Sequence, residues 1–313
     1  MTIAAILVAF AIGVGTLGGT LLRRARWTAR APYLAIATYL AAVWSAIAAL
    51  GLAGLTLAVH APALSGGLSR LIGACVLRLR ETYGTPGGAT VAAIGLTLAG
   101  AVVARTALTA ATHYRAAWQE TRRHAQTARL VGRPDAFLGA VVVEHSDPVA
   151  YCVAGRDPTV ILSTGAVDAL DSAQLQAVLA HERAHLIGRH HRLLALARVG
   201  RLVLPFLPLM RDVDTQVERL VELHADDAAA RTHDPRSLAT ALVVLATSAS
   251  PQQVLAAAAT DSVQRIHRLL RPAEPLGKLP RQLLRVGATS LALAPVALAL
   301  APAVLAVALG RVG

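Results

Sequence analysis

Four long uncharged runs constrain the fold of this chain more than any other feature. A helix that rises 1.5 Å per residue needs about 20 apolar residues to cross a hydrocarbon core of about 30 Å. The runs that reach this length without Asp, Glu, Lys or Arg are 2–22, 31–59, 84–104 and 286–310. The last run contains Pro295 and Pro302, which bundled helices tolerate where neighbouring groups satisfy the freed backbone. The chain is therefore predicted to be an α-helical polytopic membrane protein with about four transmembrane helices.

Composition agrees with a membrane protein. Hydrophobic residues make up 55% of the chain and charged residues only 15%, whereas soluble domains carry about 25% charged residues. The net charge of +12 comes mainly from arginines beside the apolar runs, which favours contact with anionic lipid headgroups over direct nucleic-acid binding. Cys75 and Cys152 stand far apart, so no disulfide framework is indicated.

The positions of the basic residues predict an orientation. Four arginines lie between residues 23 and 30, and further basic residues follow the third run and precede the fourth. Because short cytoplasmic loops are enriched in Lys and Arg, we expect these flanks to be cytoplasmic. The N-terminus and the loop 60–83, with an interfacial helix over Leu68–Leu79, would then be outside, and the expected location is the plasma membrane.

The region between the third and fourth runs differs from them in its sequence pattern. Three β-branched segments, Phe137–Glu144, Val149–Val153 and Thr159–Ser163, are divided by turn sequences and predict an antiparallel meander. A helix should follow near Ser172, with Asp171 as its cap. We therefore expect a membrane domain over 1–112 with spans at about 2–22, 31–58 and 84–108, an inserted cytoplasmic α+β domain over 113–283, and a fourth span over 284–313.

The candidate functional residues begin with His181-Glu182-Arg183-Ala184-His185 in this helix, an HExxH sequence. Residues four apart share a helix face, so both imidazoles can reach one ion, and zinc with three protein ligands is the natural occupant of a catalytic site of this kind. Glu222 on a following helix is the best candidate for the third ligand. Glu182 would act as general base, and Asp226, one turn beyond Glu222, could orient a ligand histidine.

The sequence gives less support for a role of other nearby residues in the metal site. His224 could support a transition state or the structure of the site, and Arg219 could pair with Asp226 or another acid near the metal. His190 and His191 are expected to be solvated or to cap the end of the motif helix. Cys152 is expected to be a small buried hydrophobe.

Several segments together resemble a known superfamily. These are Gln174–His185, Arg189-His190-His191, Glu222-Leu223-His224-Ala225-Asp226 and the closing Arg265-Ile266-His267-Arg268-Leu269-Leu270. They are similar to gluzincin membrane metallopeptidases over about residues 135–272. Two branches are plausible, the BlaR/MecR-type antirepressor peptidases and, more distantly, the HtpX and Ste-twenty-four kind. HtpX-like proteins insert membrane helices between HExxH and the glutamate, whereas only 36 residues separate His185 from Glu222 here, which favours the BlaR/MecR type.

The resemblance implies one zinc ion per chain on His181, His185 and Glu222, with Glu182 as general base. It also implies a substrate that lies extended along an edge strand, for which Thr159–Ser163 is the expected candidate. The apolar segment Leu193–Met210 in the gap is expected to be a packed or interfacial hairpin, because it contains two arginines and two prolines.

The function expected from these features is a membrane zinc endopeptidase acting on a cytoplasmic protein, such as a winged-helix transcriptional repressor. Housekeeping removal of misfolded membrane proteins is the alternative within the same class. A non-catalytic zinc-containing signalling scaffold is a third interpretation, although a purely structural site has no use for Glu182. Homodimerisation stays open at this point.

Overall fold

The computed structural model describes residues 2–58, 88–155, 157–248, 256–271 and 274–310. The helices are α1 (Thr2–Gly13), the π-helical η1 (Val14–Gly18), α2 (Gly19–Arg24), the 3-10 helix η2 (Arg26–Ala29), α3 (Pro32–Ala58), α5 (Gly88–Val131), α6 (Thr164–Ala169), α7 (Ser172–Ile187), α8 (His190–Val203), α9 (Pro208–Ala229), α10 (Pro235–Ser248), α11 (Ala256–Leu270) and α12 (Lys278–Gly310). The strands are β1 (Arg133–Asp135), β2 (Ala140–Val143), β3 (Ala150–Val153) and β4 (Thr159–Ser163). The predicted loop 60–83, with Leu68–Leu79 and Cys75, lies outside the described residues.

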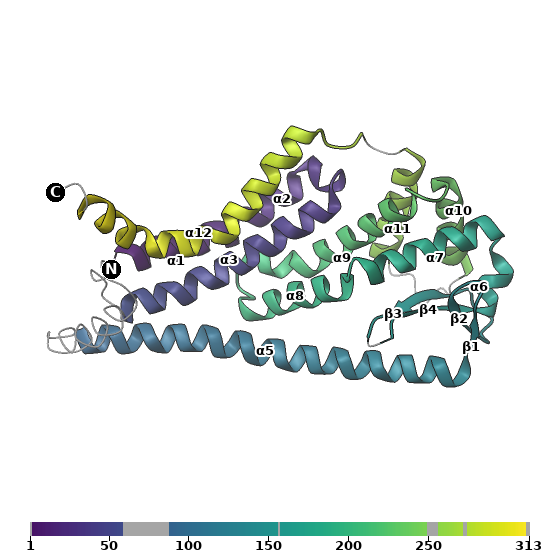
Figure 1. Cartoon of the computed structure of the whole chain (residues 1–313), viewed down its shortest axis with the longest axis horizontal. Coiled ribbons are helices and arrows are strands. Elements are labelled where there is room, and N and C mark those ends of the chain that lie inside the picture. The colour runs from purple at the N-terminus through teal and green to yellow at the C-terminus, as the bar shows by residue number, and fades with distance from the viewer. Residues whose placement is uncertain (1, 59–87, 156, 249–255, 272–273, 311–313) are drawn as a thin grey trace.

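Four helical stretches of the described chain are long and apolar enough to cross a membrane: Thr2–Arg24, Pro32–Ala58, Gly88–Arg123 and Lys278–Pro302. They coincide with the four uncharged runs of the sequence. Figure 1 shows them side by side, with both chain termini at one end of the molecule and the β-sheet at the other.

Small residues allow the membrane helices to approach closely. A Cβ atom at Gly54 of α3 would lie 2.6 Å from the carbonyl oxygen of Gly95 in α5, and the reverse distance is also 2.6 Å. Membrane helices have no hydrophobic drive toward each other, so close backbone approach at small residues supplies much of their packing energy. These two glycines therefore fix how α3 lies against α5.

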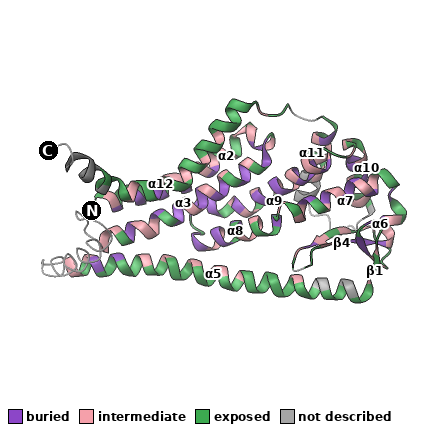
Figure 2. Cartoon of the chain, viewed as in Figure 1, coloured by how far each residue is buried: buried purple, intermediate pink, exposed green. Residues whose placement is uncertain are grey.

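The hairpin formed by α8 and α9 packs against the membrane helices. Its buried residues Val203, Leu209 and Val213 belong to one apolar cluster with Leu7 of α1 and Tyr39 of α3. Figure 2 shows buried residues running along α3, α8 and α9, whereas α5 is exposed over most of its length. The expectation of a packed hairpin for Leu193–Met210 agrees with this arrangement.

Two arginine contacts hold the hairpin in place, one to backbone carbonyls and one to a carboxylate. Arg105 of α5 donates hydrogen bonds to the carbonyl oxygens of Leu202 and Val203, at 2.7 and 2.8 Å. These carbonyls end α8 and have no partner within the helix, so the guanidinium acts as their cap. Near the start of α9, Asp212 pairs with Arg23 at the end of α2.

The sheet differs from the predicted meander. Its strand order is β1-β2-β4-β3, with β2 and β4 parallel and the other pairs antiparallel. The loop after β2 passes the end of β4, where the Ser163 hydroxyl donates to the Asp147 carbonyl and accepts from the Val149 amide, at 2.7 and 2.9 Å. The chain is thereby led to the far side of β4. The prediction that Thr159–Ser163 is an edge strand was therefore wrong, and β3 takes that position.

The predicted start of the motif helix is confirmed. Asp171 caps α7 by accepting from the Gln174 amide at 2.8 Å, and the Gln174 side chain accepts from the Asp171 amide at 3.1 Å. This reciprocal pair satisfies two backbone donors that the first turn leaves free. The helix carrying His181 and His185 thus begins at a position that its own sequence specifies.

Replacing Gly54 by alanine tests the α3–α5 contact. We expect the Gly54→Ala variant to lose about 1–3 kcal/mol of stability, because the added methyl group would clash with the Gly95 backbone. Gly100→Ala, also in a membrane helix but with nothing within 4 Å of its Cβ, should be neutral or stabilising. Thermal unfolding in detergent measures both, and equal midpoints for the two variants would contradict the packing described.

Candidate metal centre

Two crossing helices bring three candidate ligands together. His181 and His185 lie one turn apart on α7, and Glu222 projects from α9 toward them. The two histidine Nε2 atoms are 3.1 Å apart, and each lies 3.5 Å from one oxygen of the Glu222 carboxylate. The structure therefore places the three residues predicted as metal ligands around one point.

The spacing of these atoms fits a zinc ion. Ligands about 2.0–2.2 Å from a tetrahedral zinc are separated by about 3.4 Å from each other. The two Nε2 atoms are 3.1 Å apart, each approaches a different oxygen of Glu222 to 3.5 Å, and one ligand atom from each residue lies within 4.8 Å of the other two. Two imidazoles and one carboxylate are also a ligand set of catalytic zinc sites, which leave the fourth position open.

Asp226 lies on the side of His181 that faces away from Glu222. The carboxylate is fully buried, and its Oδ1 is 3.1 Å from His181 Nδ1. This carboxylate is the one that faces His181 Nδ1, and it raises the pKa of His181. A carboxylate at this nitrogen holds the ring so that Nε2 faces the metal position, as the sequence predicted for Asp226.

Arg265 of α11 was quoted in the sequence but had no predicted role. Its guanidinium forms two 2.8 Å hydrogen bonds to the Asp226 carboxylate and lies 2.9 Å from Glu222 Oε2. The side chain is only 14% exposed. A buried carboxylate requires a positively charged partner. Two acids expected near the metal, followed by a helix with an arginine on its apolar face, could therefore have predicted this pairing.

The pKa values of His181 and Glu222 favour positive charge between them, whereas burial lowers the pKa of His185 to about 4. Burial alone would lower the pKa of His181, but the carboxylates of Asp226 and Glu222 outweigh it and raise this pKa to about 9. Burial would raise the pKa of Glu222, yet His181 and Arg265 lower it to about 2. A divalent cation would take the place of the His181 proton, because a metal ligand must be deprotonated.

Glu182 lies beside the ligands without being one of them. Its carboxyl is close enough to the Cys152 thiol of β3 for a hydrogen bond, and burial raises its pKa above the usual range. A general base works best when its pKa is near the operating pH, which a raised carboxyl pKa favours. Cys152 is half-buried, as expected for a small apolar side chain, and burial together with Glu182 raises its pKa to about 12.

A cavity of about 440 Å³ opens next to β3. Residues of α5, the strand segment Tyr151–Ala154 and the histidines His185 and His190 line it. The Val149 carbonyl accepts from the Ser163 amide, so in this antiparallel pair the amide and carbonyl of Cys152 point to the open edge. An extended chain could therefore pair with β3 beside Glu182 and His185.

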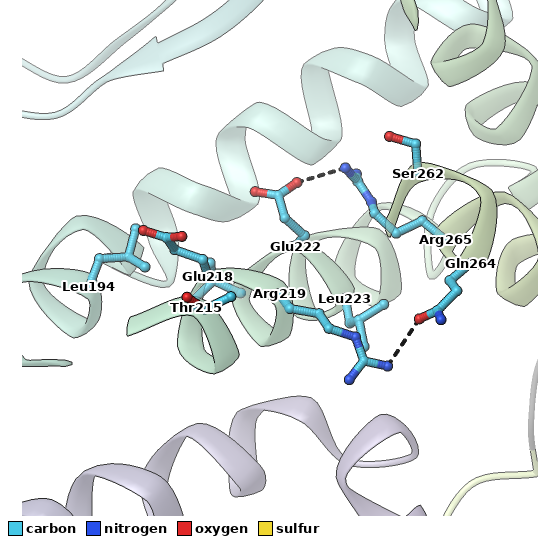
Figure 3. A pocket seen from close by; sticks show the side chains of 10 residues that line it. Leu194, Thr215, Glu218, Arg219, Glu222, Leu223, Ser262, Gln264 and Arg265 are labelled. Carbon is cyan, nitrogen blue, oxygen red and sulfur yellow. Dashed lines mark hydrogen bonds and ion pairs between the residues drawn. The ribbon is translucent and has the colours of Figure 1, made fainter. Parts of the chain in front are cut away.

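A second cavity of about 290 Å³ lies beside Glu222, between α8, α9 and α11. Figure 3 shows Glu222 and Arg265 paired in it, with Glu218 and Thr215 on one side. Arg219 also lines it but donates to Gln264 at 3.3 Å, while Arg265 is the residue paired with Asp226. Of the alternatives for Arg219, which also include an ordinary surface arginine, the pair with Asp226 is not formed.

The remaining histidines lie behind His185. His190 is only 1% exposed and contacts His185 and His224 through its two ring nitrogens, so the expectation of a solvated or capping residue was wrong for it. His191 is exposed, as expected. His224 stacks near Tyr33 of α3, with ring centroids 5.3 Å apart, and does not reach the ligand atoms directly.

This arrangement of two histidines, a glutamate ligand and a neighbouring glutamate is typical of metallopeptidases, and one comparison indicates the same class. Residues 116–211 match the model of peptidase family M48, a segment that contains His181, Glu182 and His185 and ends before Glu222. The match supports the gluzincin membrane peptidases in general and does not single out the BlaR/MecR branch. The comparisons with curated proteins and with solved structures give no match.

Loss of Arg265 tests the buried ion-pair cluster. We expect Arg265→Met to destabilise the protein by about 3–5 kcal/mol, because Asp226 would keep its charge in a buried site with only the His181 ring beside it. Arg219→Met removes an arginine from the same cavity with only a contact to Gln264 and should cost far less. Unfolding of the purified variants in detergent measures the difference. Adding Asp226→Asn to Arg265→Met should recover part of the loss.

Proposed function

We propose that this chain is a membrane-embedded zinc endopeptidase that cleaves a protein at the centre formed by His181, His185 and Glu222. The observation that carries the proposal is the convergence of these three ligands with Glu182 beside them. When bound, zinc would activate a water molecule and polarise the peptide carbonyl. A structural site would close its fourth position and would not need Glu182, which argues against a scaffold.

Glu182 carries the proton transfers in this proposal. Its carboxylate takes a proton from the attacking water and delivers it to the amine that leaves. Asp226 and Arg265 hold His181 and Glu222 in place during the reaction. The guanidinium of Arg265, beside Glu222 Oε2, lowers the pKa of Glu222 and so keeps this ligand ionised.

The substrate would bind by adding a strand to β3. Backbone hydrogen bonds to the open edge give affinity without dependence on sequence, and the pocket beside Tyr151–Ala154 receives side chains. A substrate strand at this edge passes Glu182, because Cys152 of β3 contacts that carboxyl. The position of β3 replaces the predicted role of Thr159–Ser163.

We further propose regulated cleavage of a cytoplasmic protein, such as a transcriptional repressor, with the peptidase region on the cytoplasmic side of the plasma membrane. The short link between HExxH and Glu222 and the position of the centre between the third and fourth apolar helices support it. The arginines at 23–30, and the basic residues that follow the third apolar run and precede the fourth, support the orientation. Selective cleavage of one small repressor, rather than broad degradation of membrane proteins, would distinguish this role from housekeeping.

Metal content and cleavage of casein by the detergent-purified protein test the proposed activity. We expect one zinc per chain in the wild type and in Glu182→Gln, with cleavage abolished in the variant because the general base is lost. Glu222→Ala should lower both zinc content and cleavage, since a ligand is missing. Chelation should stop cleavage and added zinc should restore it. A wild-type protein that neither binds zinc nor cleaves casein would refute the proposal.

Proline at position 152 tests the substrate edge. Cys152→Pro removes an amide that points to the open side of β3, so we expect kcat/KM for a long peptide to fall about fivefold, the equivalent of one hydrogen bond of about 1 kcal/mol. The matched control is Cys152→Ala, which also loses the thiol near Glu182 but keeps the amide. If the proline and alanine variants show the same kcat/KM, the substrate does not pair with β3.

A further inference from the structure

The turn between α7 and α8 brings a buried histidine back onto the metal centre. Helix α7 ends at Ile187, and Arg189 adopts the left-handed conformation with φ of 49° before α8 begins at His190. A Cβ atom at Gly188 would lie 2.5 Å from Nε2 of His190. Only glycine at position 188 leaves room for this ring, so the turn is built around His190.

Three imidazoles then form a line that begins at a candidate ligand. His190 Nδ1 lies 2.9 Å from His185 Nδ1, and His190 Nε2 lies 2.8 Å from His224 Nδ1. Successive rings meet edge to face, with centroids 4.7 and 5.1 Å apart. Both ring nitrogens of His190 are thus used inside the protein, at a residue only 1% exposed.

Counting protons assigns the tautomers along this line. His185 must offer a lone pair at Nε2 to bind a metal, so its Nδ1 carries the proton and donates to His190 Nδ1. Neutral His190 then carries its proton on Nε2 and donates to His224 Nδ1. The opposite direction would place a proton on His185 Nε2 and block the metal. Only the first direction makes both hydrogen bonds and leaves the ligand nitrogen free.

The two candidate histidine ligands are therefore supported by different chemistry. His181 has the Asp226 carboxylate at Nδ1, whereas His185 has the neutral imidazole of His190 at the same nitrogen. Partners at this nitrogen fix the tautomer and the orientation of a ligand ring. A neutral acceptor orients His185 without adding a further negative charge to a centre that already holds Glu182, Glu222 and Asp226.

We propose that His190 is a positioning residue for the metal: it fixes the tautomer and ring orientation of His185, with Gly188 providing the space and His224 accepting the next hydrogen bond. This inference rests on the proposed zinc site. It assigns to His190 a role that the HExxH pattern itself does not contain. It also explains why a glycine and a left-handed residue separate α7 from α8.

Zinc affinity of the full-length protein in detergent, measured by competition with a chromophoric chelator, tests this role. His190→Leu keeps an apolar volume but cannot accept a hydrogen bond, so we expect zinc binding to weaken about 10- to 100-fold. His190→Asn offers a carbonyl oxygen to His185 Nδ1 and should recover most of the affinity. The control His191→Leu, at the exposed neighbour, should bind zinc as the wild type does.

A spectroscopic readout separates positioning from general stability. In protein loaded with Co²⁺, the visible absorption bands report ligand geometry, and we expect them to change in His190→Leu and to return toward the wild-type spectrum in His190→Asn. Gly188→Ala should weaken zinc binding by displacing the His190 ring. It should add little further loss to His190→Leu, because both changes break the same contact. If His190→Leu does not fold, Gly188→Ala and His190→Asn carry the test.

The results that would overturn the role of His190 differ from those that would refute the proposed zinc peptidase. Wild-type zinc affinity and an unchanged Co²⁺ spectrum in His190→Leu would overturn the positioning role, even if the protein is a zinc peptidase. Equal weakening in His190→Leu and His190→Asn would also overturn it, because hydrogen bonding would then not be the cause. Failure of the wild type to bind zinc would instead refute the proposed function on which the inference rests.

Discussion

The buried pair of Asp226 and Arg265 is the interaction on which the rest of the centre depends. Asp226 is fully buried, and a carboxylate in such a place is tolerated only with a charged, hydrogen-bonded partner. By forking between Asp226 and Glu222, the Arg265 guanidinium joins α11 to α9, and Asp226 in turn holds His181 of α7. Three helices that are distant in sequence thus meet at one guanidinium, and the metal ligands take their positions from it.

Helix α9 connects this centre to the membrane helices. Its Val213 and Val217 pack in the apolar cluster shared with α1 and α3, while Glu222 and Asp226 project toward α7. Glu222 follows Asp212, which pairs with Arg23 at the end of α2, by ten positions along this helix. At 1.5 Å per residue the centre lies about 15 Å from the level of Arg23. The site is therefore held close to the membrane by a rigid element.

Local signals in the sequence predicted the local features of the structure. Uncharged length identified the four apolar helices, the cap Asp171 located the start of α7, and spacing brought His181 and His185 to one face. The strand order was not predictable, because it depends on hydrogen bonds between Ser163 and a loop fourteen or more residues earlier. The role of Arg265 depends on which helices cross, and that of His190 depends on the turn after α7, and no periodicity within one helix contains that information.

The segment from η2 to the start of α3, which joins the first two apolar helices, contacts two side chains next to the metal centre. Arg268, one turn beyond Arg265, donates to the Ala29 carbonyl of η2 at 3.0 Å and also pairs with Asp227. Tyr33, at the start of α3, packs against His224, the last imidazole of the line from His185. Helix α11, which carries Arg265, and the His224 ring are thereby tied to the segment from η2 to the start of α3, so the centre and the membrane helices form a single packed unit. Any displacement of α3 along its axis must move His224 or break its contact with Tyr33, because packed side chains have little free volume in which to adjust.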